Sequence, residues 1–198
     1  DTLLFLHSGI IYPEDRDPSA FFAAIARLIE QGSLSRDKVC IRFRAPSHTT
    51  EVAALAAKYN LADVVDIAPP IPYRQAIAEM LGADFLVVFQ GAQFNAQIPA
   101  KIYEYLRAGR PLLALTDPAG DTATQLRPFR EIGFADIADA GQIATTIVAS
   151  LAARQTPGHA EGLADNMHAV RRYSRITQAG TLAALFDEAR TLAASRSR

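Results

Sequence analysis

Hydrophobic residues occur in short continuous runs that alternate with stretches in which they recur every three or four positions. Runs rich in β-branched and aromatic residues predict strands, whereas the recurring pattern predicts helices of about 10 to 15 residues. The run DFLVVF is apolar at successive positions, which is typical of a strand buried on both faces. The predicted strands span residues 2–6, 39–44, 64–67, 85–89, 111–115 and, more weakly, 134–137.

This alternation of strands and helices is typical of βαβ units. Each helix returns the chain for another parallel strand, through a crossover that is almost always right-handed. We therefore predict an α/β fold with a doubly wound, mostly parallel, Rossmann-like sheet.

Start and stop residues mark the helices between the predicted strands. Asp17 is expected to cap the first helix, with Pro18 as its first residue and Gly32 as its stop. A later helix is expected to begin at Pro99 and to end at Gly109. The other predicted starts are Thr50, Tyr73 and, as an N-cap, Asp121.

Beyond residue 138 the pattern is helical to the end of the sequence. One helix is predicted over 140–155, and two more follow a break at TPGHAEG, over 163–173 and from 174 onward. We expect residues 1–198 to form a single domain with a helical C-terminal extension over about 155–198. The sequence begins with Asp rather than Met and enters a predicted strand at once, so we expect a domain excised from a longer protein.

The composition is that of a soluble globular protein, because 49% of the 198 residues are hydrophobic and 21% are charged. The formal net charge is −1 with both signs mixed along the chain, which argues against a nucleic-acid partner. No apolar run approaches the ~20 residues of a membrane span and no signal-peptide pattern is present, so no transmembrane segment is expected. The single cysteine, Cys40, cannot form an internal disulfide and favours a reducing, cytoplasmic compartment.

Ligands of open parallel sheets bind beyond the carboxyl ends of the strands, so the loops there are the candidates. The loop after the first strand holds Gly9 and Arg16. Glycine lets the backbone approach a phosphate, and arginine can bind one through two nitrogen atoms. The alternative, a turn at Gly9 and a solvated surface charge at Arg16, stays open on these residues alone. His7, at the end of the same strand, is placed to reach the cleft, although a lone histidine is more often structural.

The loop over 90–98 is polar and leads into the helix from Pro99, whose free N–H groups can hold an anion. Gln97 offers an amide dipole beside them. Lys101 lies in the first turn of this helix, where its charge opposes the helix dipole. A surface salt bridge with Glu104 is the alternative, but lysine before glutamate is the less favourable order. An anion shared by Lys101 and the helix amides explains the lysine, and a hydroxylated ligand explains the glutamate.

A third loop, TDPAGDTA, follows the fifth predicted strand. Thr122 could supply a hydroxyl to phosphate, while Asp121 is better explained as an N-cap. The four histidines show no metal-ligand spacing, and the sequence contains neither a CxxC nor a GxSxG pattern. We therefore expect no protein-bound metal and no hydrolase of the Ser/His/Asp or Cys/His type.

Together these stretches resemble the C-terminal, donor-binding domain of GT-B glycosyltransferases, in particular the group 1, family 4 type. IPAKIYEYLRAGRPLLAL followed by TDPAGDTA is similar to their donor-binding segment, and HSGIIYPEDRDPSAFFAAIARL to their first strand, glycine loop and helix. VVDIAPPIPYRQAIAEMLGADFLVVF resembles their base-binding loop with the next helix and strand, and YSRITQAGTLAALFDEA resembles their closing helix. The resemblance covers nearly the whole chain but only one half of such an enzyme, so it implies an absent N-terminal acceptor domain.

The resemblance implies that Glu104 holds the ribose hydroxyls of a nucleotide. Gln97 and Thr122, from the loops after the fourth and fifth predicted strands, complete the predicted donor site. No residue of this chain is assigned a catalytic role. The positions that match elements near the diphosphate are Gly9, Arg16 and Lys101, and those where backbone frames the base are Ile71 and Pro72.

The implied function is transfer of a sugar, of the hexosyltransferase type, from a nucleoside diphosphate to an acceptor with retention of anomeric configuration. A nucleoside diphosphate sugar is the expected donor substrate and partner, and no cofactor is expected. Ala96 departs from the family pattern, which often has a second glutamate eight positions before Glu104. The acceptor and any catalytic base would come largely from the absent domain, so this chain alone is expected to be inactive.

Two alternatives remain for the function. One is a nucleotide-sugar epimerase-like domain on the same scaffold, and the other is a non-catalytic α/β module that binds protein partners. Membrane contact would be peripheral and would come through the absent domain.

Overall fold

The computed structural model describes residues 2–12 and 14–196 of the chain. The described strands form one six-stranded sheet in the order β3-β2-β1-β4-β5-β6, and every pairing is parallel. This arrangement confirms the predicted doubly wound α/β fold class. The strands are β1 (Leu3–Ser8), β2 (Val39–Arg44), β3 (Val65–Ala68), β4 (Phe85–Gln90), β5 (Leu112–Thr116) and β6 (Ile132–Ala135).

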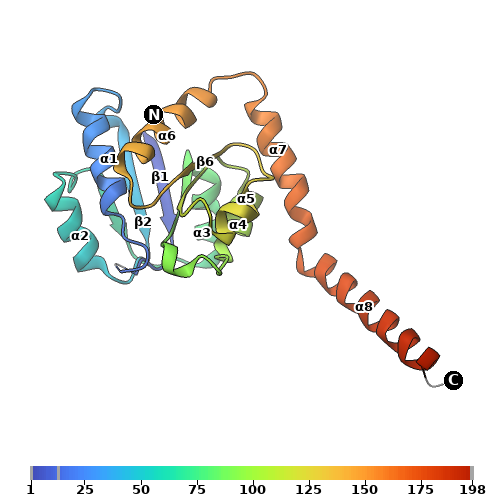
Figure 1. Cartoon of the computed structure of the whole chain (residues 1–198). Helices are drawn as coiled ribbons and strands as arrows, with labels where there is room; N and C mark the ends of the chain where they lie inside the picture. The colour runs from blue at the N-terminus through green and yellow to red at the C-terminus, as the bar shows by residue number, and fades with distance from the viewer. Residues whose placement is uncertain (1, 13, 197–198) are drawn as a thin grey trace.

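Among the described residues, the α-helices are α1 (Ser19–Glu30), α2 (Thr49–Lys58), α3 (Tyr73–Gly82), α4 (Lys101–Ala108), α5 (Asp121–Leu126), α6 (Ala140–Ala153), α7 (His159–Ala169) and α8 (Arg175–Arg196). Helices lie on both faces of the sheet (Figure 1). One face packs against α1, α2 and α6 in a core that contains Phe21, Val52 and Ile143. The other face packs against α3, α4 and α5 in a core that contains Met80 and Tyr105. Because every pairing is parallel, the carboxyl ends of the described strands lie at one edge of the sheet.

Several helix starts differ from the expected ones. Helix α2 begins at Thr49 rather than Thr50, and α4 begins at Lys101 rather than at Pro99. Helix α1 begins at Ser19, one residue after Pro18, although the Asp17 carboxylate accepts a hydrogen bond from the Ser19 N–H at 2.8 Å. The predicted N-cap at Asp121 is wrong, because Gly120 is the N-cap of α5 and no side chain caps this helix. Asp121 is instead the first helical residue, and its N–H donates to the carbonyl oxygen of Asn95 at 2.8 Å.

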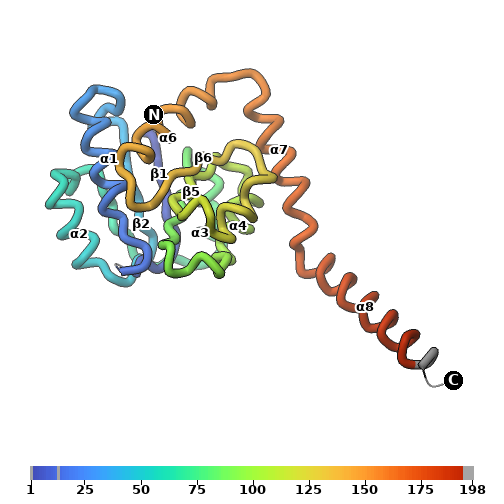
Figure 2. The backbone as a smooth tube through the Cα atoms, in the orientation of Figure 1, coloured from blue at the N-terminus to red at the C-terminus, as the bar shows by residue number. Residues whose placement is uncertain are grey.

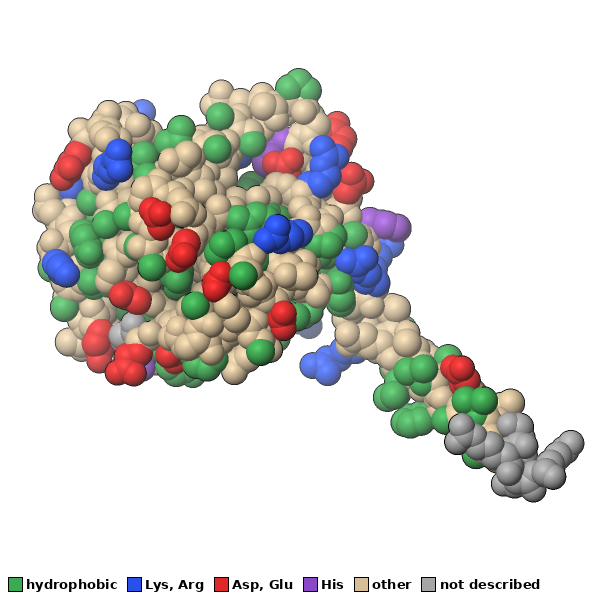
Figure 3. Space-filling view, viewed as in Figure 1, with side chains coloured by type: hydrophobic (Ala, Val, Ile, Leu, Met, Phe, Trp, Pro, Cys, Tyr) green, Lys and Arg blue, Asp and Glu red, His purple; other side chains and the backbone are tan. Residues whose placement is uncertain are grey.

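The C-terminal helices leave the sheet after α6. The break predicted at TPGHAEG is shorter than expected, because Gly158 adopts a left-handed φ of +88° and α7 begins at the next residue. Helix α7 runs beside α4 (Figure 2), where Met167 packs against Gly109. Helix α8 extends away from the sheet with apolar side chains on its surface (Figures 1 and 3), and Ile176 is 88% exposed. Within the described ranges, none of the helices is long and apolar enough to cross a membrane.

Candidate functional site

A seam at the middle of the sheet marks the point where the strand order reverses, between β1 and β4. The pairs in register there are Phe5 with Phe85 and Leu6 with Leu86. Beyond them, the imidazole Nδ1 of His7 lies 2.9 Å from the carbonyl oxygen of Val87. A side-chain hydrogen bond thus joins β1 to β4 beyond the last paired residues. Such a switch point is where open α/β sheets bind ligands.

His7 is a buried, neutral side chain at this seam. It is 3% exposed, and its ring packs against Phe43 and Phe89. Because Nδ1 donates to Val87, Nε2 is the acceptor, and it faces the Lys101 ammonium nitrogen at 3.2 Å. Burial, followed by the charge on Lys101, holds the pKa of His7 well below its ordinary value. The ring thus holds the lysine in place without carrying charge.

Lys101, the first residue of α4, is partly buried against the loop after β1. A Cβ atom at Gly9 would lie 2.7 Å from the lysine Nζ, and Gly9 has a φ of +121° that disfavours other residues. Burial, and then the charge on Arg16, lowers the pKa of Lys101 to about 7, while Glu104 opposes the shift. The charge on Arg16 therefore acts on Lys101 at the N-terminus of α4, an arrangement that favours a bound anion.

Arg16 is held by its own loop. Its Nη1 donates to the carbonyl oxygen of Ile10 at 3.2 Å, and its guanidinium lies 5.3 Å from the centre of the Tyr12 ring. Among the charged groups, Arg16 makes the largest contribution to the lowered pKa of Lys101. The positive charge of Arg16 therefore disfavours the charged form of Lys101 unless an anion is bound between them. The structure thus places Gly9 against Lys101, and Arg16 in the same loop as Gly9.

Glu104 is exposed one helical turn beyond Lys101. The structure does not show the surface salt bridge considered above: among the described contacts, Lys101 faces His7, whereas Glu104 accepts a hydrogen bond from the Tyr73 hydroxyl at 3.3 Å. Tyr73 is 67% exposed and follows directly on Ile71 and Pro72. The carboxylate of Glu104 consequently lies beside the loop predicted to frame the base.

An ion-pair network, not predicted from the sequence, anchors the loop that holds Ile71 and Pro72. Arg44 donates through Nη1 to the carbonyl oxygen of Pro69 at 2.6 Å and through Nη2 to Glu79 at 2.5 Å. Glu79 also accepts from Arg42 at 3.0 Å, and Arg42 pairs with Asp66 at 2.6 Å. Two arginines on the same face of a predicted strand, in the run CIRFR, were the available signal.

Thr122, in the first turn of α5, contacts Gln97 in the loop that leads into α4. Thr122 is 1% exposed, and its hydroxyl donates to the carbonyl oxygen of Gln97 at 3.0 Å. This hydroxyl is therefore engaged within the protein, while the residue Gln97 is exposed. The part of the chain that the structure describes contains no group of three or more His, Cys, Asp or Glu side chains that could hold a metal ion.

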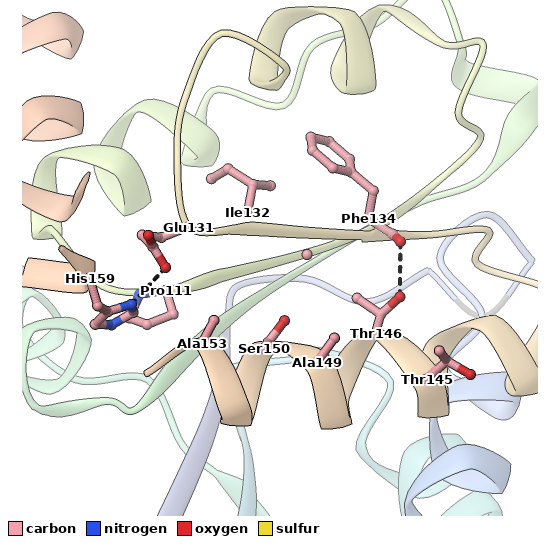
Figure 4. Close-up of a pocket in the computed structure, with 11 residues that line it drawn as sticks. Pro111, Glu131, Ile132, Phe134, Thr145, Thr146, Ala149, Ser150, Ala153 and His159 are labelled. Carbon is pink, nitrogen blue, oxygen red and sulfur yellow. Dashed lines mark hydrogen bonds and ion pairs between the residues drawn. The ribbon is translucent and has the colours of Figure 1, made fainter. Parts of the chain in front are cut away.

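A separate cavity of about 400 Å³ lies between β6 and α6 (Figure 4). His159 and Glu131 close one end of it, with Nδ1 and Oε2 2.6 Å apart, and the Thr146 hydroxyl donates to Phe134 at 3.0 Å. The lining includes Pro111 and Glu131, which precede β5 and β6, so the cavity lies near the amino ends of these strands. It is therefore remote from the carboxyl ends of the strands, where Lys101 and the candidate site lie.

No family model and no curated protein matches the sequence, but solved structures match the fold. Trehalose-6-phosphate synthase from Burkholderia multivorans superimposes with a TM-score of 0.72 over 100% of this chain, at 13% identity. Sucrose-phosphate synthase from Thermosynechococcus elongatus gives 0.70 over 96% at 16% identity. WaaG, a glycosyltransferase involved in lipopolysaccharide biosynthesis, gives 0.64 over 85% at 16% identity. The chain spans less than half of each of these proteins, 44%, 46% and 42% of their respective lengths.

Proposed function

From a fold shared with one half of GT-B glycosyltransferases, we propose that this chain is the nucleotide-sugar donor-binding half of such an enzyme. The observation that carries the proposal is the pair of cations, Lys101 and Arg16, at the N-terminus of α4 with Glu104 one turn away. The whole protein would transfer a hexose from a nucleoside diphosphate to an acceptor. The acceptor site would lie in an N-terminal domain outside this chain, and this chain alone would be inactive.

The diphosphate would lie at the start of α4, where Lys101, Arg16 and the positive end of the helix dipole supply positive potential. The same groups would stabilise the negative charge that develops on the leaving diphosphate during transfer. Protein groups rather than a resident cofactor provide this charge in the proposal. Gly9 leaves the room that the Lys101 side chain occupies.

The nucleoside would lie on the side of Glu104 that faces Tyr73. Two vicinal hydroxyls of a ribose can each donate to one carboxylate oxygen, and these hydrogen bonds are strengthened by the charge. Ile71 and Pro72 would frame the base, on a loop that Arg44 fixes through Pro69. Gln97 and Thr122 would support the loop beside the sugar.

The proposal also includes retention of anomeric configuration and a cytoplasmic location. Retention is the outcome that the family resemblance implies, although Ala96 places no carboxylate at the position where the family often has one. A cytoplasmic location is supported by the single unpaired Cys40, since disulfides are rare in reducing compartments.

We expect calorimetric titration with UDP, GDP, ADP and TDP to show binding of one of them, weakened by Glu104→Gln. The amide keeps one acceptor oxygen but loses the charge, so the loss is about 1.5–3 kcal/mol, or roughly 10- to 150-fold in Kd. Glu188→Gln on the exposed surface of α8 is the matched control and leaves Kd unchanged. Absence of binding by all four nucleotides, or equal affinity of the Glu104 variant, would contradict the proposal.

A further inference from the structure

The loop after β4 is tied to the loop after β1. The Gly91 N–H donates to the carbonyl oxygen of Asp15 at 2.8 Å. Gln93 adds two bonds from Nε2, to the Glu14 carbonyl oxygen and to the Asp15 carboxylate, each at 3.0 Å. Since Arg16 follows Asp15 directly, these contacts connect the β4 loop to one of the two cations.

The same loop is tied on its other side to the loop after β5. Asn95 donates through Nδ2 to the Asp117 carboxylate at 2.6 Å and accepts at its carbonyl oxygen from the Asp121 N–H at 2.8 Å. Thr122 adds the bond to Gln97. Asn95 is thus the residue that joins the two loops through both its side chain and its main chain.

The packing around Asn95 leaves little freedom. A Cβ atom at Gly120 would lie 2.6 Å from Asn95 Oδ1, so the two loops touch closely. Asn95 Oδ1, Gln90 Oε1 and Thr116 Oγ1 are buried without a hydrogen-bond partner among the described residues. Unsatisfied buried polar atoms cost free energy, and in folded proteins they call for a specific explanation. Gln90 and Thr116 are the last residues of β4 and β5, so two of these atoms lie beneath the loops of the candidate site, and the third lies within the loop after β4.

We propose that Asn95 is a positioning residue for the diphosphate site. Its hydrogen bonds with Asp117 and Asp121, which we call the clasp, fix the conformation of the chain where it enters α4. This inference rests on the proposed function. Asn95 precedes Lys101 by six residues. If the loop that contains Asn95 moved, the lysine and the first amides of α4 would be displaced with it. The loops after β1, β4 and β5 consequently act as one unit that sets the spacing of Arg16 and Lys101.

A reciprocal exchange of the two side chains tests the clasp. Asn95→Ala removes the donor, and Asn95→Asp places a second carboxylate beside Asp117, whose pKa is held low by its hydrogen bonds. The double variant Asn95→Asp with Asp117→Asn restores one amide-to-carboxylate bond in the reverse direction. In Asp117→Asn the Oδ1 atom can still accept from the Ala119 N–H, as it does in the native chain at 2.8 Å.

Two readouts separate this inference from the proposed function. Amide hydrogen exchange without any ligand reports the clasp, and we expect protection of the Asp121 N–H to fall about tenfold in both single Asn95 variants. Titration with UDP, GDP, ADP and TDP reports the site, and we expect Kd of the bound nucleotide to rise about tenfold. The reciprocal double variant should restore both values, whereas Asp187→Asn on α8, a matched change of charge, should alter neither.

Unchanged exchange in Asn95→Ala would overturn the clasp whether or not a nucleotide binds. Increased exchange with unchanged Kd would overturn the positioning role, because the loops would then move without affecting the site. Failure of the native chain to bind any of the four nucleotides would overturn the proposed function, and with it the positioning role, while the exchange data would still decide the clasp.

Discussion

Lys101→Met is expected to weaken nucleoside diphosphate binding by roughly 10- to 150-fold at pH 6.5. The methionine keeps the length of the buried stem but removes the charge at the start of α4. A hydrogen bond to a charged group contributes about 1.5–3 kcal/mol, which corresponds to this loss in Kd. Lys58→Met on α2, whose ammonium lies over the Tyr59 ring, is the matched control and leaves Kd unchanged.

The same lysine makes binding depend on pH. In the free protein the pKa of Lys101 is about 7, and a bound diphosphate raises it by placing negative charge nearby. Binding therefore takes up a proton above pH 7, and Kd rises with pH by up to about tenfold per unit. Isothermal titration between pH 6 and 9 measures this slope, which Lys101→Met should flatten. A parallel slope in both proteins would contradict the proposed contact between Lys101 and the diphosphate.

Rising pH has the opposite effect on stability: it weakens nucleotide binding but increases the contribution of Lys101 to the free energy of unfolding. The pKa of Lys101 is about 7 in the folded state against an ordinary value of 10.5, so between these values the unfolded chain binds more protons. The free energy of unfolding contributed by this group consequently increases from pH 7 toward pH 10.5. Urea titrations of the native chain and of Lys101→Met, compared at pH 7 and pH 9, isolate this contribution.

Glu79→Ala is expected to lower the free energy of unfolding by about 3–5 kcal/mol. The Glu79 and Arg44 side chains are only 10% and 11% exposed, so the arginine would be left buried without its carboxylate. The hydrogen bond from Arg44, above all, lowers the pKa of Glu79 from its ordinary 4.5. The stabilisation is therefore present at neutral pH and is lost as the pH falls below about 4.5.

Urea unfolding with an unchanged m value measures this effect. Glu51→Ala is the control, because its contact with His48 is exposed and should leave the unfolding midpoint unchanged. Nucleotide binding should also weaken in Glu79→Ala, since Arg44 loses the partner that holds it against Pro69. A loss of stability below about 1 kcal/mol would show that the network is already well solvated.

Hydrophobic patterning predicted the strands and their order along the chain because each strand is a local run of apolar residues. The ends were less accurate where polar residues take part in pairing. Strand β1 extends through His7 and Ser8, which pair with Phe43 and Arg44. The predicted strand ended at residue 6, because both of these residues are polar. Strand β6 begins at Ile132, before the predicted range, because it is registered with Leu112 of β5.

The position of Lys101 at the start of a helix was also predictable from the sequence. Lys101 stood out because it opposes the dipole of its own helix, and that anomaly depends only on local sequence. The contacts that fix the site join residues distant in the chain. Asn95 and Asp117 are 22 residues apart, and Arg44 and Glu79 are 35 apart, so no local pattern predicts either pair.

The seam between β1 and β4 has a consequence for the assembly of the sheet. The pairing of β1 with β4 joins residues 80 positions apart, such as Phe5 and Phe85, whereas residues paired elsewhere in the sheet are at most 36 apart, as Leu3 and Val39 are. Strands β1 to β3 and strands β4 to β6 are thus two half-sheets, each built from near neighbours in the chain. Within the sheet, the longest loop is closed at this one pairing, where the rings of Phe5 and Phe85 stack. The place where ligands of such sheets bind is therefore also the place where two half-sheets, each formed by strands close together in the chain, meet.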